Sequence, residues 1–389
     1  GVDEDNISDL LSHGTSPDFD PAELVLPLQY AATASGSLAS NVSFGADGPA
    51  AGGGFGFASS ATTTLAGLGL TSKGGHLSFQ IIGDTVYAYV NGGGGAGLDS
   101  FQDRPVFSLE LNATTGAFTF RQYDQLDHVD GNGENTALKT GADTSIPNID
   151  FGAVITATDK DGDSIPLTGK LTVTITDDVP VTNGDVVAGK TLDDEAQTVF
   201  TPVNNGGTDD VSPNVKTVSG GFGALFAAGT DDRAAIEVTG PTLNVVYKDA
   251  NGFAQTEAVT WTSVTNPTTG TVTLTGSSAH YGSAAVLTVG VDGSYGFTMN
   301  APVAHDVPGT SEEDATLKFN VKVTDFDQDS ATGSLTIKVD DDTPTAIATV
   351  SPATVLDDEA QTLFPANHGG PFDSPTDTNT VSGGQGALF

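Results

Sequence analysis

The sequence predicts an all-β protein made of tandem Ig-like or cadherin-like β-sandwich modules that form an extended string. Three observations predict this fold. Thr, Val, Gly and Asp are abundant, whereas helix-favouring residues are scarce. Many short segments alternate apolar and polar side chains, as strands with one buried face do. The chain also repeats itself over long distances, which is the sequence signature of repeat architectures.

The internal repeat has a period close to 164 residues. The segment LDDEAQT at residues 192–198 returns at residues 356–362, and VSGGFGALF at residues 218–226 returns as VSGGQGALF at residues 381–389. The last copy stops in the middle of a pattern, so we expect the chain to be part of a longer polypeptide. We expect one β-sandwich unit over residues 1–183, a second over residues 184–347, and the N-terminal fragment of a third over residues 348–389.

The best defined part of each unit is a strand, an acidic loop, a second strand and an acidic pair before a proline. In unit 1 this segment is VITATDKDGDSIPLTGKLTVTITDDVP at residues 154–180, and in unit 2 it is VKVTDFDQDSATGSLTIKVDDDTP at residues 321–344. Leu171, Val173 and Ile175 alternate with threonines. This period of two predicts a half-buried antiparallel strand with its apolar face inward.

The loop between the two strands has an aspartate at every second position. The loop aspartates are Asp159, Asp161 and Asp163 in unit 1 and Asp325, Asp327 and Asp329 in unit 2. Carboxylates this close repel one another by on the order of kilocalories per pair, so a counter-ion is needed. Calcium fits a flexible loop of oxygen ligands better than magnesium, which requires octahedral geometry. The alternative is a solvated acidic turn, in which Asp and Gly are common for backbone reasons.

The loop does not have the sequence of an EF-hand. Ser164 stands where an EF-hand loop needs glycine, and Lys170 stands where it needs a bidentate glutamate. The calcium prediction therefore depends on the aspartates themselves.

The second acidic element of each unit is the pair that precedes the proline. These residues are Asp177 and Asp178 in unit 1 and Asp341 and Asp342 in unit 2. A strand of about nine residues, roughly 30 Å at about 3.3 Å per residue, separates the loop from the pair, so the two cannot share an ion. We predict that they share one across units, with Asp177 and Asp178 approaching the aspartate loop of unit 2. Calcium would then clamp neighbouring repeats of the same chain together.

A further oxygen-rich loop lies in unit 1. Asp130, Asn132 and Glu134 have the spacing of calcium ligands. The same spacing fits a plain turn, and the sequence leaves both readings open.

Composition excludes several classes of function. The chain has 389 residues, with 50 acidic and 13 basic side chains and a formal net charge of -37. This charge repels nucleic acid and anionic membrane surfaces and attracts cations. The absence of cysteine excludes disulfides and thiolate metal sites, and no apolar run is long enough to span a membrane.

We expect the chain not to be an enzyme. No nucleophile elbow or phosphate-binding glycine loop occurs, and the six histidines form no HxxxH pair. A glycosidase would need one carboxylic acid beside an apolar wall, whereas these carboxylates fall in hydrophilic turns.

Several motifs together resemble a known family. VDEDN at the start of unit 1, VSFGADG, LDHVDGNGENTAL and the two acidic hairpin segments resemble the tandem modules of giant bacterial adhesins exported by type I secretion, the RTX adhesin or T1SS-143 repeat family. The acidic segments are also similar in logic to cadherin repeats, whose junctions calcium stiffens. Gln328 departs from the pattern because it replaces the loop glycine, and Ile165, Pro166 and Leu167 are additional residues in unit 1.

The resemblance implies a calcium-stiffened extender region of a large secreted adhesin on the bacterial cell surface, with a role in attachment and biofilm formation. It also implies calcium ligation by the aspartates of both loops and both pairs. Two alternatives remain open. The units could bind a ligand such as a glycan, or identical chains could assemble into an extracellular filament or surface layer.

Overall fold

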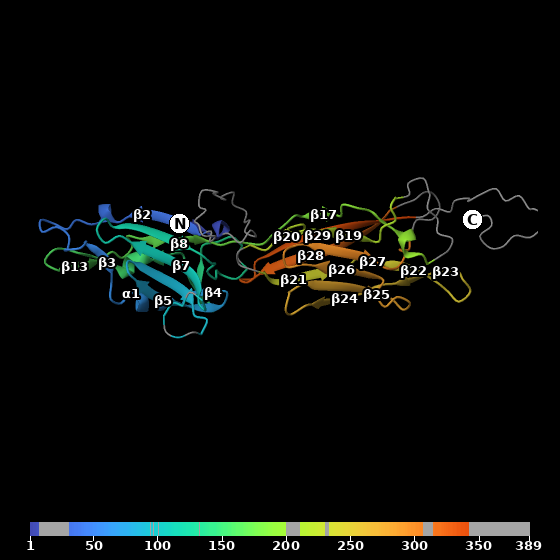
Figure 1. The fold of residues 1–389 in the computed structure, drawn as a ribbon, viewed down its shortest axis with the longest axis horizontal. Helices are drawn as coiled ribbons and strands as arrows, with labels where there is room; N and C mark the ends of the chain where they lie inside the picture. The colour runs from blue at the N-terminus through green and yellow to red at the C-terminus, as the bar shows by residue number, and fades with distance from the viewer. Residues whose placement is uncertain are drawn as a thin grey trace, which may run out of the picture.

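The chain forms two β-rich units that lie end to end along the long axis of the molecule (Figure 1). The computed structural model describes residues 1–7, 31–93, 95, 97–99, 101–131, 133–199, 211–229, 233–305 and 314–341. The predicted all-β fold is confirmed, because strands dominate both units and the longest helix described, α1 (Ala61–Ala66), has 6 residues. The third predicted unit, residues 348–389, lies outside the described residues.

One layer of unit 1 is a six-stranded antiparallel sheet. Its order is β2 (Ala32–Ser37), β8 (Ala117–Gln122), β7 (Arg104–Leu111), β6 (Thr85–Val90), β5 (Gly75–Ile82) and β4 (Thr71–Ser72).

The facing layer of unit 1 consists of shorter strands. The pairs are β13 (Ser164–Pro166) with β12 (Ile155–Thr158) and β3 (Phe55–Phe57), β11 (Ile149–Asp150) with β14 (Thr172–Val173), β1 (Val2–Asp3) with β15 (Ile175–Thr176), and β9 (Leu138–Gly141) with β10 (Thr144–Ile146). Phe107, Phe120 and Phe151 pack between the layers, with ring centroids 5.4 to 5.8 Å apart. Three interlocking aromatic rings anchor the core of this unit.

The strand predicted over residues 171–176 is interrupted in unit 1, which corrects the prediction of one continuous strand there. Leu171, Val173 and Ile175 are buried as the alternation indicates, but β14 pairs with β11 whereas β15 pairs with β1. The break falls at Thr174, where the chain changes its partner from β11 to β1 and the Thr174 carbonyl accepts a hydrogen bond from the N–H of Val2.

Unit 2 is a sandwich of two larger sheets. One sheet contains β17 (Asp185–Val187), β29 (Ser330–Asp340), β28 (Ala315–Asp325) and β21 (Arg233–Thr239), with β18 (Leu192–Asp193) also paired to β29. The other contains β19 (Thr217–Gly220), β27 (Tyr295–Met299), β26 (Ala285–Val289), β25 (Val272–Ser277) and β24 (Thr260–Thr265).

Shorter elements complete the described fold. The paired strands are β22 (Asn244–Lys248) with β23 (Ala254–Ala258) and β16 (Val181–Thr182) with β20 (Phe226–Ala227). The 3-10 helices are η1 (Glu4–Asn6), η3 (Ala39–Asn41), η4 (Phe151–Val154) and η5 (Asp194–Gln197).

The acidic hairpin of unit 2 lies at the centre of its sandwich. Every second side chain of β28 from Leu317 to Val323 is buried, as the alternation predicts. The Phe319 ring lies 5.4 Å from those of Phe297 and Trp261 on the opposing sheet. The hairpin is therefore held rigidly, and its turn, residues 325–329, lies at the end of unit 2 that meets unit 1 (Figure 1).

Candidate metal centre

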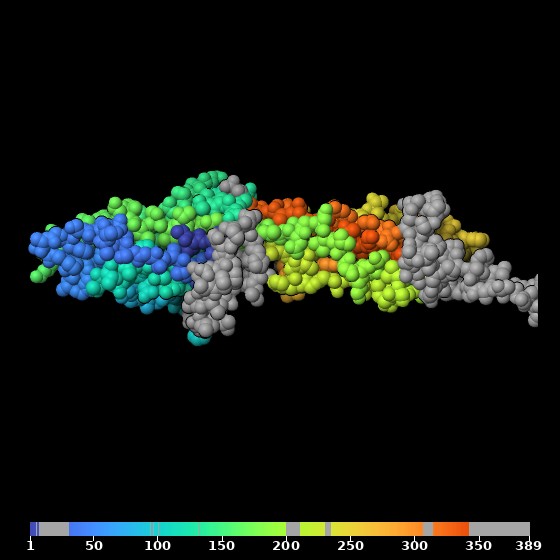
Figure 2. Space-filling model, turned by 90° about the horizontal axis from the view of Figure 1, so that it is seen from above, coloured from blue at the N-terminus to red at the C-terminus, as the bar shows by residue number. Residues whose placement is uncertain are grey.

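The candidate site lies where the two units meet. Unit 1 contributes the residues that follow β15 and the loop between β8 and β9, and unit 2 contributes the turn between β28 and β29. The N–H of Gly131 donates to the Asp327 carbonyl (3.0 Å), and the N–H of Gly133 donates to Asp329 Oδ1 (2.8 Å). Contact between the green loop of unit 1 and the orange end of unit 2 is visible in the space-filling view (Figure 2).

The turn of unit 2 has a defined backbone. The N–H of Asp325 donates to the Asp329 carbonyl (3.0 Å), and the N–H of Asp329 donates to Asp325 Oδ1 (2.7 Å). Gln328 adopts a left-handed conformation (φ +78°) that favours glycine. The departure noted at Gln328 therefore leaves the turn intact, and local hydrogen bonds direct its aspartates to one side.

The carboxylates from the two units form one cluster. Potential ligand atoms of Asp177, Asp327 and Asp329 all lie within 4.8 Å of one another. These side chains are 1%, 2% and 5% exposed, and Asp325 beside them is fully buried. The structure thus brings Asp177, one member of the acidic pair of unit 1, into a single buried group with the aspartate loop of unit 2.

Several oxygens of this cluster lack a hydrogen-bond partner among the described residues. Both carboxylate oxygens of Asp327, Oδ2 of Asp325 and Oδ2 of Asp329 are buried without one. Burial of an ionised oxygen without a partner is costly, because water no longer solvates it. A hard divalent cation fits this donor set, which offers oxygen atoms alone from flexible carboxylates.

The pKa values show how strongly the cluster disfavours negative charge. Burial raises the pKa of Asp325 to about 9, and the close approach of the Asp327 carboxylate raises it further. Burial also raises the pKa of Asp177 to about 7, although the contact with His128 opposes the shift, and burial raises the pKa of Asp329. Burial and mutual proximity therefore favour the protonated form of these three carboxyl groups.

Sequence reasoning missed two residues behind the cluster, His128 and Glu4, which are fully buried. Nδ1 of His128 lies 3.2 Å from Asp177 Oδ1 and 3.8 Å from Glu4 Oε2. Burial lowers the pKa of His128, but the Glu4 charge and the contact with Asp177 outweigh it and raise this pKa to about 9. The signal was present in VDEDN and LDHVD, two motifs that supported the family resemblance alone.

Two further contacts surround the cluster. Asp178 is fully buried and lies against Gly229 of unit 2, where an added Cβ would be 2.8 Å from Asp178 Oδ2. The ring of Phe326 lies against the turn at Gly74 of unit 1, 3.1 Å from the position of a Cβ there. The junction therefore combines apolar packing with the acidic cluster.

The aspartate loop of unit 1 lies at the other pole of that unit. Ligand atoms of Asp159, Asp161 and Asp163 lie within 4.8 Å of one another, and the side chains are largely exposed. Its aspartates are therefore not part of the cluster at the junction.

The other sequence-predicted residues lie elsewhere. Asp130 forms an ion pair with Lys139 (2.6 Å), and Glu134 is exposed. Their loop contacts unit 2 through backbone N–H groups. Asp341 lies at the far pole of unit 2, whereas Asn132 and Asp342 fall outside the described residues.

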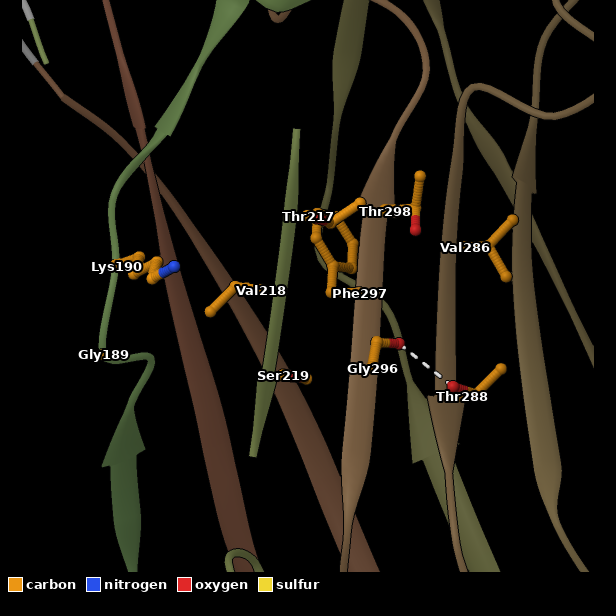
Figure 3. Close-up of a pocket in the computed structure, with 10 residues that line it drawn as sticks. All are labelled: Gly189, Lys190, Thr217, Val218, Ser219, Val286, Thr288, Gly296, Phe297 and Thr298. Carbon is orange, nitrogen blue, oxygen red and sulfur yellow. Dashed lines mark hydrogen bonds between the residues drawn. The ribbon is translucent and has the colours of Figure 1, made fainter. Parts of the chain in front are cut away.

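A groove of about 470 Å³ lies over the outer face of β19, β27 and β26 (Figure 3). Thr217, Ser219 and Thr298 line it, with Lys190 at one side. The hydroxyl of Thr288 donates to the Gly296 carbonyl (3.1 Å). Its lining is mostly hydroxyl and apolar groups, far poorer in buried charge than the junction.

Comparison with known proteins identifies part of the chain. Residues 2–172 match a family model described as a domain of unknown function, DUF5801. No curated protein and no solved structure matches the chain. Within the described residues, no helix has the length and apolar character that crossing a lipid bilayer requires. Because no function is assigned to the matched domain, the function must be argued from the junction.

Proposed function

We propose that the junction binds calcium and that the bound calcium locks successive β-sandwich units into a stiff rod. The observation that carries this proposal is Asp327, whose two carboxylate oxygens are buried between the units and have no hydrogen-bond partner in the described part of the chain. A cation there would contact unit 2 through Asp327 and Asp329 and unit 1 through Asp177. It would therefore join the two units directly.

The chain's own residues prepare this site. His128 supplies one buried positive charge on the unit 1 side and holds Asp177 in place. The N–H groups of Gly131 and Gly133 orient the loop of unit 2 before any cation binds. Calcium would supply the remaining positive charge, and its affinity in extracellular modules is about 10⁻⁴ to 10⁻³ M.

On this basis we propose that the chain is a non-catalytic, calcium-stiffened extender segment of a large secreted adhesin on a bacterial cell surface, where it supports attachment and biofilm formation. The end-to-end units, the sequence repeat and the strongly acidic composition support this role. An extender must keep its two ends far apart, and stiff junctions between independent units achieve this with few contacts per unit.

The test measures how widely the distance between the units varies. Because the chain has no cysteine, cysteines introduced at the exposed Thr63 and Thr262 can be spin-labelled uniquely. We expect a broad distance distribution in chelator and a narrow one in calcium, and we expect Asp327→Asn to abolish the narrowing.

The matched control is Asp161→Asn, which changes the equivalent position of the unit 1 loop at the other pole. The distance distribution of this variant should become narrower in calcium, as that of the wild type does. Equal distributions with and without calcium in the wild type would refute the clamp.

A further inference from the structure

The pole of unit 2 that faces away from unit 1 repeats the construction of the junction. In unit 1, β1 pairs in parallel with β15 and leads into η1, and in unit 2, β18 pairs in parallel with β29 and leads into η5. The first acidic residue of each 3-10 helix, Glu4 or Asp194, accepts a hydrogen bond from the N–H two residues before a histidine. Both units therefore present an acid from a helix start next to a histidine.

The side chains at this pole also match. Nε2 of His305 lies 3.3 Å from Asp194 Oδ2, and Nδ1 of His305 lies 3.9 Å from Asp341 Oδ1. His128 likewise lies between two acids at the junction, although its Nδ1 alone faces both of them. Asp341 thus takes the place that Asp177 has in unit 1.

The two poles differ in what covers them. At the junction, where the loop of unit 2 lies on the pole, Asp177 is 1% exposed. At the far pole, the side chains of Asp341 and His305 are 23% and 11% exposed. A cavity of about 340 Å³ opens beside them, lined in part by Leu243 and Asp314. Among the described residues, the far pole therefore has a cavity where the junction has a docked loop.

The matching loop is present at the opposite end of the molecule. In the unit 1 loop, the N–H of Asp159 donates to the Asp163 carbonyl (3.0 Å), and the N–H of Asp163 donates to Asp159 Oδ1 (2.9 Å). These are the two hydrogen bonds that shape the docked turn of unit 2. The loop extends from β12 to β13 at the far end of unit 1 (Figure 1).

We infer that the pole formed by Asp194, His305 and Asp341 is a docking site for an aspartate loop, and that residues 159–163 of a second copy of this chain occupy it in calcium. The internal junction shows which kind of segment fits this constellation. The inference depends on the proposed function, because both surfaces are acidic and repel each other unless a cation lies between them.

The contact joins different surfaces of the two copies, so it is head-to-tail and does not close. It is expected to give linear oligomers whose length increases with protein concentration. Lys160 stands where the docked loop has Phe326, so this contact lacks one apolar anchor of the internal junction. We therefore expect the association to be reversible.

The test is sedimentation velocity of the whole chain in calcium and in chelator over a wide range of protein concentration. In calcium, we expect the wild type to form a series of oligomers and Asp161→Asn and Asp341→Asn each to remain monomeric. A mixture of these two variants should form dimers and nothing larger, because only one intact loop and one intact pole remain to meet. Circular dichroism verifies that each variant is folded.

The two proposals fail differently. If calcium narrows the inter-unit distances but every protein stays monomeric, the docking inference is wrong and the clamp stands. If the two variants associate as the wild type does, the contact does not use these residues and the inference is also wrong. If calcium changes neither property, both proposals are wrong.

Discussion

Replacing Asp327 by asparagine is expected to change stability in opposite directions with and without calcium. Without calcium, two unit charges no more than 4.8 Å apart at an effective dielectric constant of about 20 repel by at least about 3 kcal/mol. Asparagine has nearly the same shape, removes one charge, and can donate hydrogen bonds to the neighbouring carboxylate oxygens. Because protonation already relieves part of the repulsion, we expect a net gain of about 1–2 kcal/mol in the free energy of unfolding.

With calcium the sign reverses. At a calcium concentration about one hundred times the dissociation constant, binding to the folded state adds about 2.7 kcal/mol to the stability of the wild type. The Asp327→Asn variant loses a charged ligand and should lose most of this increment. The difference between melting temperatures in calcium and in chelator is therefore the informative quantity, and about 1 kcal/mol corresponds to roughly 2–4 °C for units of this size.

Scanning calorimetry of three proteins provides the measurement. The wild type and Asp161→Asn should both melt at a higher temperature in calcium, whereas Asp327→Asn should show little response to calcium and a raised melting temperature in chelator. An Asp327→Asn variant that is destabilised in chelator, or that responds to calcium as the wild type does, would show that repulsion at the junction is not the controlling energy.

Three further predictions follow from the junction. Gly229→Ala should weaken the docking of unit 2 by about 1–3 kcal/mol, because the added Cβ clashes with Asp178. Gly223→Ala is the control and should cost less, because Gly223 also has a positive φ but has open space around it. Chemical denaturation in calcium compares the stabilities of the two variants. Gln328→Gly should stabilise the chain by about 0.5–1 kcal/mol, because this position has a positive φ that favours glycine. The reverse change at the equivalent position of the unit 1 loop, Gly162→Gln, should destabilise the chain for the same reason. Equal and negligible shifts of the melting temperature in both variants would count against this strain argument. Because the pKa values of the buried junction carboxylates are raised, the folded chain without calcium holds protons that the unfolded chain releases, and these groups lower the stability as pH rises from their unfolded to their folded pKa. Calcium must displace those protons, so the calcium-induced rise in melting temperature should grow between about pH 5 and pH 8. Calorimetric titration of calcium in two buffers should detect the released protons.

The sequence alone determined the secondary structure class and the positions of the acidic turns. Alternation at Leu171, Val173 and Ile175 depends on a period of two that is local to the chain, so the burial of these side chains was predictable. In unit 2, the spacing between the two acidic elements also excluded a shared ion, because β29 runs unbroken from Ser330 to Asp340 and strand length follows from residue number. Chain geometry of this kind needs no knowledge of the tertiary fold.

Only the tertiary structure decided which acids are buried together. The loops at Asp159 and at Asp325 have the same hydrogen bond from a backbone N–H to the first aspartate side chain, yet one loop is exposed and the other is enclosed by the neighbouring unit. Glu4 and His128 are more than 100 residues apart and meet only because β1 joins the sheet beside β15. Burial and charge pairing depend on such distant contacts, and for this reason no local pattern could predict the environment of the cluster.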